Sequence, residues 1–221
     1  MDDQKIIIVL EGPAGSGKST VAEGLIKEGF FNVPRSPLQE KNVRDYGFYG
    51  DDSFYSQAKD LTLLSKALSY PHQYPMIDRF FLSQMVYGAL RANQPVSSAA
   101  LWISHLRKLA GVIQDDYQIR KTSGAWPMTM RTSPPDFFFL ILLPTVGQLT
   151  YQRKKTGKRY PFNAADECSL YSRLTTKMGW CRPIYFGIDT SKEQVQHQAF
   201  SYIKEMFQLK GAPYVSRHEA R

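Results

Sequence analysis

Apolar residues occur along this chain in two patterns: short, mainly apolar runs and longer stretches with helical spacing. Five runs have the length of a β-strand and lie at residues 6–10, 30–33, 75–78, 136–143 and 184–188. Every residue of 6–10 and of 137–143 is apolar, which is typical of strands buried on both faces of a parallel sheet. We therefore expect both to be buried strands, and 136–143 to be one of the central strands of the sheet.

Between these runs, apolar residues recur every three or four positions, as on one face of a helix. This spacing predicts helices over about 19–28, 53–69, 82–93, 97–119, 145–154, 165–177 and 190–208. Ser53, either Ser97 or Ser98, and either Thr190 or Ser191 are the expected N-caps of three of them, and Thr145 is expected to start another. Strands that alternate with helices predict right-handed crossovers, and hence an α/β fold with a parallel sheet.

The length of 221 residues fits one such domain, which we place at 1–209, followed by a loose tail at 210–221. Cys168 and Cys181 form no disulfide framework, and no signal peptide or membrane-spanning run is visible, so we predict a cytoplasmic protein. The net charge of +8 fits a nucleic-acid partner, a polyanionic small substrate or simply a soluble surface. The charge alone does not decide among these three.

A phosphate-binding loop follows the first strand. Gly12, Gly17, Lys18 and Ser19 match the pattern G-x-x-x-x-G-K-[ST], in the required order of strand, loop and helix. The glycines allow backbone N–H groups to turn toward phosphate oxygens at the positive end of a helix. Lys18 is expected to reach the β- and γ-phosphates of ATP, and the Ser19 hydroxyl to bind Mg²⁺. The predicted ATP-binding residues are Gly12, Pro13, Ala14, Gly15, Ser16, Gly17, Lys18, Ser19 and Thr20.

Two further features favour a kinase among the proteins that carry such a loop. Asp78 and Arg79 directly follow the third strand, where the carboxylate can organise Mg²⁺ and the guanidinium can clamp an anionic substrate. A basic stretch, RKKTGKRY, follows the helix predicted to start at Thr145. We expect a small lid there, at about 153–164, with Arg153 and Arg159 stabilising the transferring phosphate. A surface ion pair and a solvated loop are the plain alternatives.

At this point the chain resembles the thymidylate kinase and deoxynucleoside kinase superfamily, and thymidylate kinases most closely. The resemblance rests on four short segments in the family's order: Glu11 before the loop, Arg35-Ser36-Pro37, Asp78-Arg79-Phe80 with Ser83, Gln84 and Tyr87, and Ile188-Asp189-Thr190-Ser191. It implies a five-stranded parallel sheet with helices on both faces, a site for ATP and Mg²⁺, a lid, and an Arg–Phe–Tyr acceptor pocket.

The chain also departs from thymidylate kinases. Ser36 stands where they have Glu, and no basic residue lies between Gly12 and Gly17, so the catalytic cation must come from the lid, as in the bacterial type. Phe54 and Gln57 are spaced as in deoxynucleoside kinases, where a Gln reads the edge of the base. The identity of the base therefore stays open.

The residues after the second strand bear on the acceptor. A nucleoside 5′-hydroxyl needs a carboxylate base, whereas a monophosphate needs cationic clamps. The chain offers Arg35 there, and Arg79 after the third strand, so we predict ATP-dependent transfer to a deoxynucleoside monophosphate similar to dTMP. Glu40 could still act as a base, which keeps a deoxynucleoside kinase as the alternative.

The remaining acceptor contacts are assigned in the same way. Phe54 is expected to stack on the base, Gln57 to read its edge and Tyr87 to pack under the sugar, although core or surface roles fit these residues about as well. A kinase that acts on a modified base in DNA, and a regulatory nucleotide-binding module without turnover, also stay open. DNA binding is not favoured, and assembly as a homodimer is undecided.

Overall fold

The computed structural model describes residues 6–34, 62–68, 74–92, 136–177 and 181–209. Its strands are β1 (Ile6–Glu11), β2 (Phe31–Asn32), β3 (Pro75–Asp78), β4 (Asp136–Pro144) and β5 (Cys181–Phe186). Its helices are α1 (Lys18–Lys27), α4 (Phe81–Ala92), α6 (Val146–Thr156), α7 (Ala164–Lys177) and α8 (Lys192–Leu209), together with a helical turn at 62–68. The predicted helix at 97–119, most of that at 53–69 and the tail at 210–221 lie outside the described residues.

The five strands form one parallel sheet in the order β2-β3-β1-β4-β5. β1 lies at the centre, pairing Ile8 with Met76 of β3 and Val9 with Phe139 of β4. The five apolar residues at 6–10 are buried as predicted, and so is Glu11, which ends the strand. The predicted α/β fold with a five-stranded parallel sheet is confirmed.

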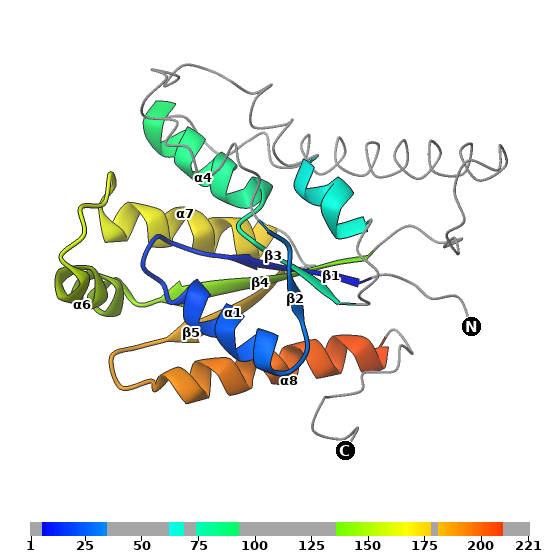
Figure 1. Ribbon diagram of the computed structural model, residues 1–221. Coiled ribbons are helices and arrows are strands. Elements are labelled where there is room, and N and C mark those ends of the chain that lie inside the picture. Colours follow the sequence, from blue (N-terminus) through cyan, green and yellow to red (C-terminus); the bar gives the residue numbers. More distant parts are fainter. Residues whose placement is uncertain (1–5, 35–61, 69–73, 93–135, 178–180, 210–221) are drawn as a thin grey trace, which may run out of the picture.

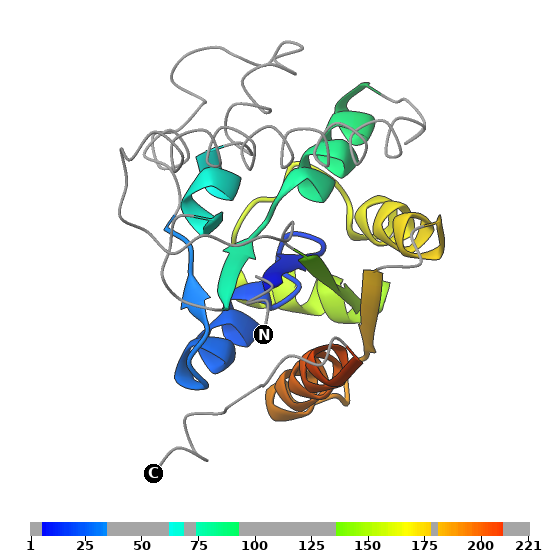
Figure 2. The same ribbon diagram turned by 90° about the vertical axis from the view of Figure 1, so that its right-hand side faces the viewer.

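Helices cover both faces of the sheet, because successive strand residues point to opposite sides. Ile7 and Val9 of β1 pack in a core with α4, α7 and the turn at 62–68. Ile6, Ile8 and Leu10 pack in a second core with α1 and α8. Figures 1 and 2 show these two helical layers above and below the sheet.

Two helices begin where the sequence predicted, at Thr145 and Ser191. The Thr145 hydroxyl accepts a hydrogen bond from the Gln148 amide at 3.2 Å, at the start of α6. The Ser191 hydroxyl accepts one from the Gln194 amide at 3.2 Å, and the Gln194 side chain accepts one in return at 2.7 Å, which forms a capping box at the start of α8. Local sequence thus fixes where both helices begin.

The last strand differs from its prediction, since β5 runs over Cys181–Phe186 rather than 184–188. Pro183 made a strand unexpected at 181–183, because proline has no N–H group to donate to a neighbouring strand. β5 lies at the edge of the sheet with β4 as its neighbour, and one of its sides therefore needs no donor. The edge position explains why a strand forms across this proline.

The carboxyl ends of β1 and β4 point to the same end of the sheet, where the loop from β1 to α1, helix α6 and the connection 157–163 gather (Figure 1). Ligands bind at this end in open α/β folds. No helix among the described residues combines the length and the apolar character needed to cross a bilayer.

Candidate functional site

The loop from β1 to α1 needs glycine at three positions. Gly12, Gly15 and Gly17 have φ angles of 140°, 86° and 84°, which side-chain-bearing residues rarely adopt. A β-carbon on Gly12 would lie 2.5 Å from the carbonyl oxygen of Leu142 in β4. Gly17 is the N-cap of α1, so its left-handed conformation sets the direction in which the helix leaves the loop.

Lys18 is buried inside this loop at the first position of α1. Its ammonium donates hydrogen bonds to the carbonyl oxygens of Gly12 at 2.9 Å and Pro13 at 2.6 Å, and contacts the Ser16 hydroxyl at 3.2 Å. Burial lowers the pKa of Lys18 well below its usual value, the Arg79 charge lowers it further, and Asp78, Glu11 and Glu167 oppose this. An anion in this loop would therefore meet a partly desolvated cation.

Two oxygen donors flank Lys18 and fit a magnesium ion. Ser19 is exposed in the first turn of α1, and Asp78 is the last residue of β3, paired in register with Leu10 of β1. A hydroxyl and a carboxylate are ligands that Mg²⁺ accepts beside substrate phosphates. These two residues are therefore suited to hold the ion that the loop pattern predicts.

Glu11, the last residue of β1, is fully buried and fixes the start of α4. One carboxylate oxygen accepts hydrogen bonds from the amides of Phe80 at 2.7 Å and Ser83 at 3.2 Å, and the other accepts from the Ser83 hydroxyl. The Tyr171 hydroxyl of α7 lies 3.5 Å from that second oxygen. Burial raises the pKa of Glu11, although these hydrogen bonds and Arg79 partly offset the rise.

Arg79 connects β3 to α4 and is held in an unusual backbone conformation. Its φ is 68°, and its amide donates to the Leu10 carbonyl at 2.9 Å. A left-handed conformation at a residue other than glycine costs about 1–3 kcal/mol, and residues strained in this way cluster at functional sites. Burial alone would lower the pKa of Arg79, but Tyr171 and Tyr87 outweigh this and raise it, so the guanidinium stays charged.

Tyr87 belongs to α4, and its side chain contacts the guanidinium of Arg79. Arg79 Nη1 donates to the Tyr87 hydroxyl at 3.1 Å, and its Cζ lies 5.5 Å from the ring centroid. The Tyr87 hydroxyl in turn donates to Glu167 of α7 at 2.9 Å, and the ring stacks on Phe162 at 6.0 Å. The structure thus places two of the predicted acceptor residues, Arg79 and Tyr87, in contact.

Arg153, at the base of the predicted lid, reaches the phosphate-binding loop. Its side chain is 9% exposed, its Nε and Nη2 donate to the Ala14 carbonyl at 3.0 and 2.9 Å, and its Nη1 donates to the Phe162 carbonyl at 2.9 Å. It also forms an ion pair with Glu167 at 2.7 Å, and its Cζ lies 4.4 Å above the Tyr160 ring. The structure therefore places the guanidinium of Arg153 against the phosphate-binding loop, and its role as a lid cation stays a prediction.

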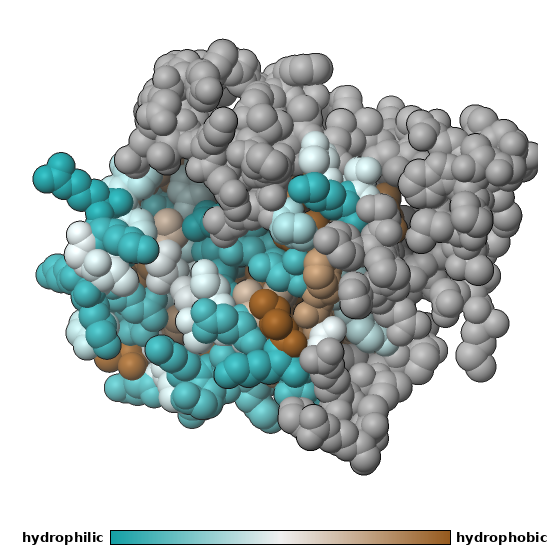
Figure 3. Space-filling view, in the orientation of Figure 1, coloured by the Kyte–Doolittle hydropathy of each residue, from teal (hydrophilic) through white to brown (hydrophobic). Residues whose placement is uncertain are grey.

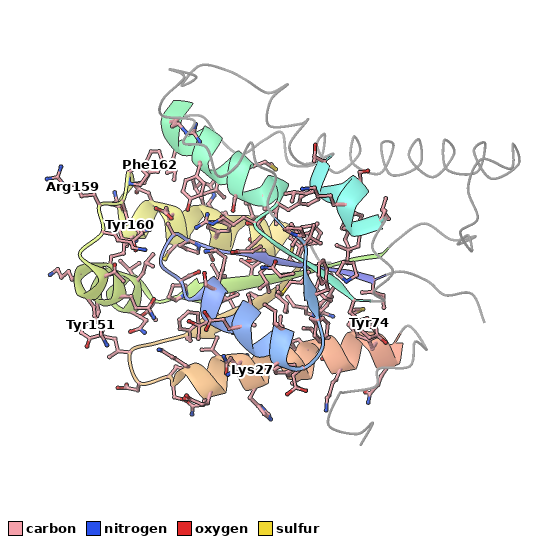
Figure 4. All side chains as sticks on the ribbon, in the orientation of Figure 1. Lys27, Tyr74, Tyr151, Arg159, Tyr160 and Phe162 are labelled. Atoms are coloured by element: carbon pink, nitrogen blue, oxygen red, sulfur yellow. The ribbon has the colours of Figure 1, made fainter. Side chains whose placement is uncertain are left out.

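Arg159, the second predicted lid cation, is exposed and points away from the sheet in Figure 4. Lys154, Lys155 and Lys158 are exposed beside it, and Figure 3 shows the mainly hydrophilic surface at this end of the molecule. An open pocket of about 450 Å³ lies between α6, the connection 157–163 and the start of α7, lined in part by Arg153, Lys154 and Lys158. The region is cationic, and only Arg153 of its two predicted lid arginines is buried.

Two buried residues of α7 escaped the sequence analysis. Glu167 and Tyr171 stand four positions apart, and both are fully buried. Cys168 and Leu174 are buried beside them on the same helix, so Glu167 is an acid within an apolar stripe. A charged residue on the apolar side of the predicted helix was the signal that could have identified Glu167, since a buried carboxylate needs hydrogen-bonding or charged partners.

The remaining predicted acceptor residues, Arg35, Phe54 and Gln57, lie outside the described residues, as does the alternative base, Glu40. The placed part of the candidate site therefore consists of the phosphate-binding loop, Asp78, Arg79 and Tyr87, with Arg153 from the lid. Cations and a carboxylate gather here around a loop suited to phosphate.

Neither a protein-family model nor a curated protein matches the sequence. Solved structures do match the fold. Thymidylate kinase from Candida albicans is 17% identical with a TM-score of 0.53, and the match covers 91% of this chain and 92% of that one. Deoxyadenosine kinase from M. mycoides, solved with dCMP and dCDP, is 16% identical with a TM-score of 0.52, covering 90% and 99%. The YorR protein of Bacillus subtilis is 14% identical with a TM-score of 0.52, covering 91% and 98%. The chain thus has the fold of thymidylate kinases and deoxyadenosine kinase, as the four short segments indicated.

Proposed function

We propose that this protein is a cytoplasmic, ATP- and Mg²⁺-dependent kinase that phosphorylates a deoxynucleoside monophosphate similar to dTMP, within deoxynucleotide synthesis. The observation that carries the proposal is the position of Arg79. Arg79 directly follows β3 in a left-handed backbone conformation, and its amide donates to the carbonyl of Leu10, two residues before the phosphate-binding loop begins at Gly12. The charge of its guanidinium lowers the pKa of Lys18, after the larger effect of burial. Two cations whose fields overlap are suited to two anionic groups, one from the donor and one from the acceptor.

The roles follow from this geometry. Lys18 and the amides of the phosphate-binding loop hold the ATP phosphates, and Ser19 and Asp78 would hold Mg²⁺, which neutralises charge on the phosphates when bound. Arg79 and Arg35 bind the acceptor phosphate, one oxygen of which attacks the γ-phosphorus as the bond to the β-phosphate breaks. Arg153 stabilises charge in the transition state.

The other predicted residues complete the proposal. Arg159 is a second candidate cation, whose contribution requires the lid segment at 153–164 to close over the phosphates. Phe54 and Gln57 contact the base, and Tyr87 borders the sugar while its hydroxyl links Arg79 to Glu167. All of these residues belong to one domain, 1–209, in this proposal.

A second candidate is a deoxynucleoside kinase, because the fold matches the M. mycoides deoxyadenosine kinase as closely as it matches the thymidylate kinase. In that reading Glu40 supplies the base and the acceptor carries no phosphate. The position of Arg79 is then less well explained, because no second anion is present for it to bind.

The deciding experiment incubates the full chain with radiolabelled ATP, Mg²⁺ and each of the four deoxynucleosides or their monophosphates, and separates the products. Label in a deoxynucleoside diphosphate is expected, with the thymine nucleotide the best acceptor. Label only in monophosphates would establish the second candidate and overturn the first. If the protein binds ATP but transfers label to neither nucleosides nor monophosphates, it is a regulatory nucleotide-binding module. A DNA duplex that carries modified bases is included as a further acceptor, to test for a kinase that acts on DNA. The Lys18→Ala variant controls for contaminating kinases.

A further inference from the structure

Glu167 joins three segments, one of which is the phosphate-binding loop. It lies in the first turn of α7 and is fully buried. Its Oε1 accepts from Arg153 Nη2 at 2.7 Å, and its Oε2 accepts from the Ala14 amide at 2.8 Å and the Tyr87 hydroxyl at 2.9 Å. One carboxylate thus contacts the loop, α4 and α6 at once.

The ion pair of Glu167 and Arg153 holds residue Ala14 from both sides. The Ala14 amide donates to Glu167, while the Ala14 carbonyl accepts two hydrogen bonds from Arg153. The amide and carbonyl of one residue belong to successive peptide planes, so the pair fixes the orientation of both. Arg153 also packs on the next residue, because a β-carbon on Gly15 would lie 3.4 Å from its Cγ.

We propose that Glu167 is a positioning residue for phosphoryl transfer, which orients Arg153 and sets the tip of the phosphate-binding loop. The inference rests on the proposed function. A carboxylate that only packed the lid against α7 would contact α6 alone. Glu167 instead reaches from Tyr87, the partner of Arg79 on the acceptor side, to Ala14 on the ATP side.

The orientation of Arg153 depends on this carboxylate because the other acceptors of its guanidinium are backbone carbonyls. Within the described part of the chain, four hydrogen bonds fix the planar group, and Glu167 supplies the one charged partner among them. A side chain with several rotatable bonds that loses this partner is left poorly placed, and small errors in placement reduce catalysis strongly.

The kinetic test compares Glu167→Gln, Arg153→Ala and the double variant with the wild type. Each single change should lower kcat by about 10- to 100-fold, with the KM for ATP altered less than about threefold. The double variant should be no slower than Arg153→Ala, because both changes remove one unit. Glu167→Asp keeps the charge and should recover part of the rate. Losses that multiply in the double variant, or an unchanged kcat in Glu167→Gln, would overturn the proposal.

Asp166 gives a matched control. It is the neighbouring acid on α7, it is exposed, and its side chain and amide contact Asn163. Asp166→Asn should leave kcat within about twofold of the wild type, since nothing in the contacts of Asp166 reaches the loop. An equal loss in both variants would mean that any change at the start of α7 disturbs activity, which would count against a specific role for Glu167.

Amide hydrogen exchange of Ala14, measured by NMR, tests the contact without any activity assay. Glu167→Gln should speed this exchange by about tenfold or more, because it replaces a charged acceptor. Unchanged exchange in both Glu167→Gln and Glu167→Asp would overturn the positioning role. If the wild type phosphorylates no acceptor, the proposed function fails, whereas the Ala14 exchange still decides whether Glu167 sets the loop. Should Glu167→Gln not fold, Glu167→Asp is compared with Asp166→Asn in both measurements.

Discussion

Two fully buried glutamates flank the phosphate-binding loop and differ in what they bind. Glu11 accepts from the amides of Phe80 and Ser83, the Ser83 hydroxyl and Tyr171, all of them neutral groups. Glu167 accepts from neutral groups as well, but its Oε1 also pairs with the guanidinium of Arg153. The same residue type therefore serves as an anchor for α4 in one place and as a link between the phosphate-binding loop and α6 in the other.

The two carboxylates act together on Lys18, because both Glu11 and Glu167 raise its pKa against the effect of burial. The neutral partners of Glu11 allow an uncharged replacement, since an amide oxygen also accepts hydrogen bonds. Glu167 does not allow an uncharged replacement in this way, because the guanidinium of Arg153 is a charged partner. The comparison teaches that burial alone does not say whether a carboxylate needs its charge; the partners do.

The largest expected effect lies at Lys18, on which both carboxylates act. Lys18→Ala should lower phosphoryl transfer by about 100-fold or more, since removing one such electrostatic donor usually has this consequence. The fold should persist, because Lys18 belongs to neither apolar cluster of the core. Initial rates give the transfer, and circular dichroism controls for the fold. A variant that retains more than about a tenth of the wild-type rate would contradict the role assigned to Lys18.

Arg153 and Arg159, the two arginines of the predicted lid, sharpen the comparison on the side of Glu167. Arg153→Ala should lower kcat by about 10- to 100-fold, because Arg153 contacts the loop, and Arg159→Ala by less, because Arg159 is exposed. Steady-state kinetics on both variants measure the difference. A change in the KM for ATP alone would instead make Arg153 a ground-state phosphate ligand.

Glu11→Ala breaks the anchor of α4 and should mainly affect stability. It leaves the buried amides of Phe80 and Ser83 without their acceptor, so we expect the free energy of unfolding to fall by about 2–4 kcal/mol. Glu11→Gln should lose less than half as much, because its amide oxygen can still accept. Urea unfolding at neutral pH provides both values, and equal losses would show that the charge matters at Glu11 too.

The smallest expected effect is the pH dependence of the stability that Glu11 contributes. Burial raises the pKa of Glu11 above that of the unfolded chain, so in the window between the two values the folded state keeps a proton that the unfolded state has released. Stability contributed by this group is therefore lost as the pH rises from the ordinary glutamate range through the raised pKa. Glu11→Gln should flatten this slope in urea unfolding measured across that window, and an unaltered slope would contradict the assignment.

The sequence predicted the parts of the site that depend on neighbouring residues. The loop from Gly12 to Thr20 could be predicted because its glycines, Lys18 and Ser19 lie close together in the sequence and directly follow an apolar strand. The end of β3 at Asp78 and the caps at Thr145 and Ser191 are local in the same sense. Arg153 was predicted as a lid cation from the basic stretch around it.

The contacts of Glu167 could not be predicted, because they depend on the packing of distant segments. Ala14 and Glu167 are 153 positions apart, and their hydrogen bond requires α7 to lie over the loop. The start of β5 was missed for a related reason, since only the edge position in the sheet makes Pro183 acceptable in a strand. The pattern and spacing of residues predict which helix or strand forms, whereas the segments packed against it decide its long-range hydrogen bonds and its exact bounds.

The proline in β5 has a consequence for association between molecules. A strand at the edge of a sheet is a template to which a strand of another chain can add, and proline at such an edge removes a donor. Arg182 and Tyr185, which flank the middle of β5, are exposed, and at the opposite edge β2 is only two residues long. Both described edges therefore resist extension of the sheet into aggregates, and we expect any self-association of this protein to use its helical surfaces.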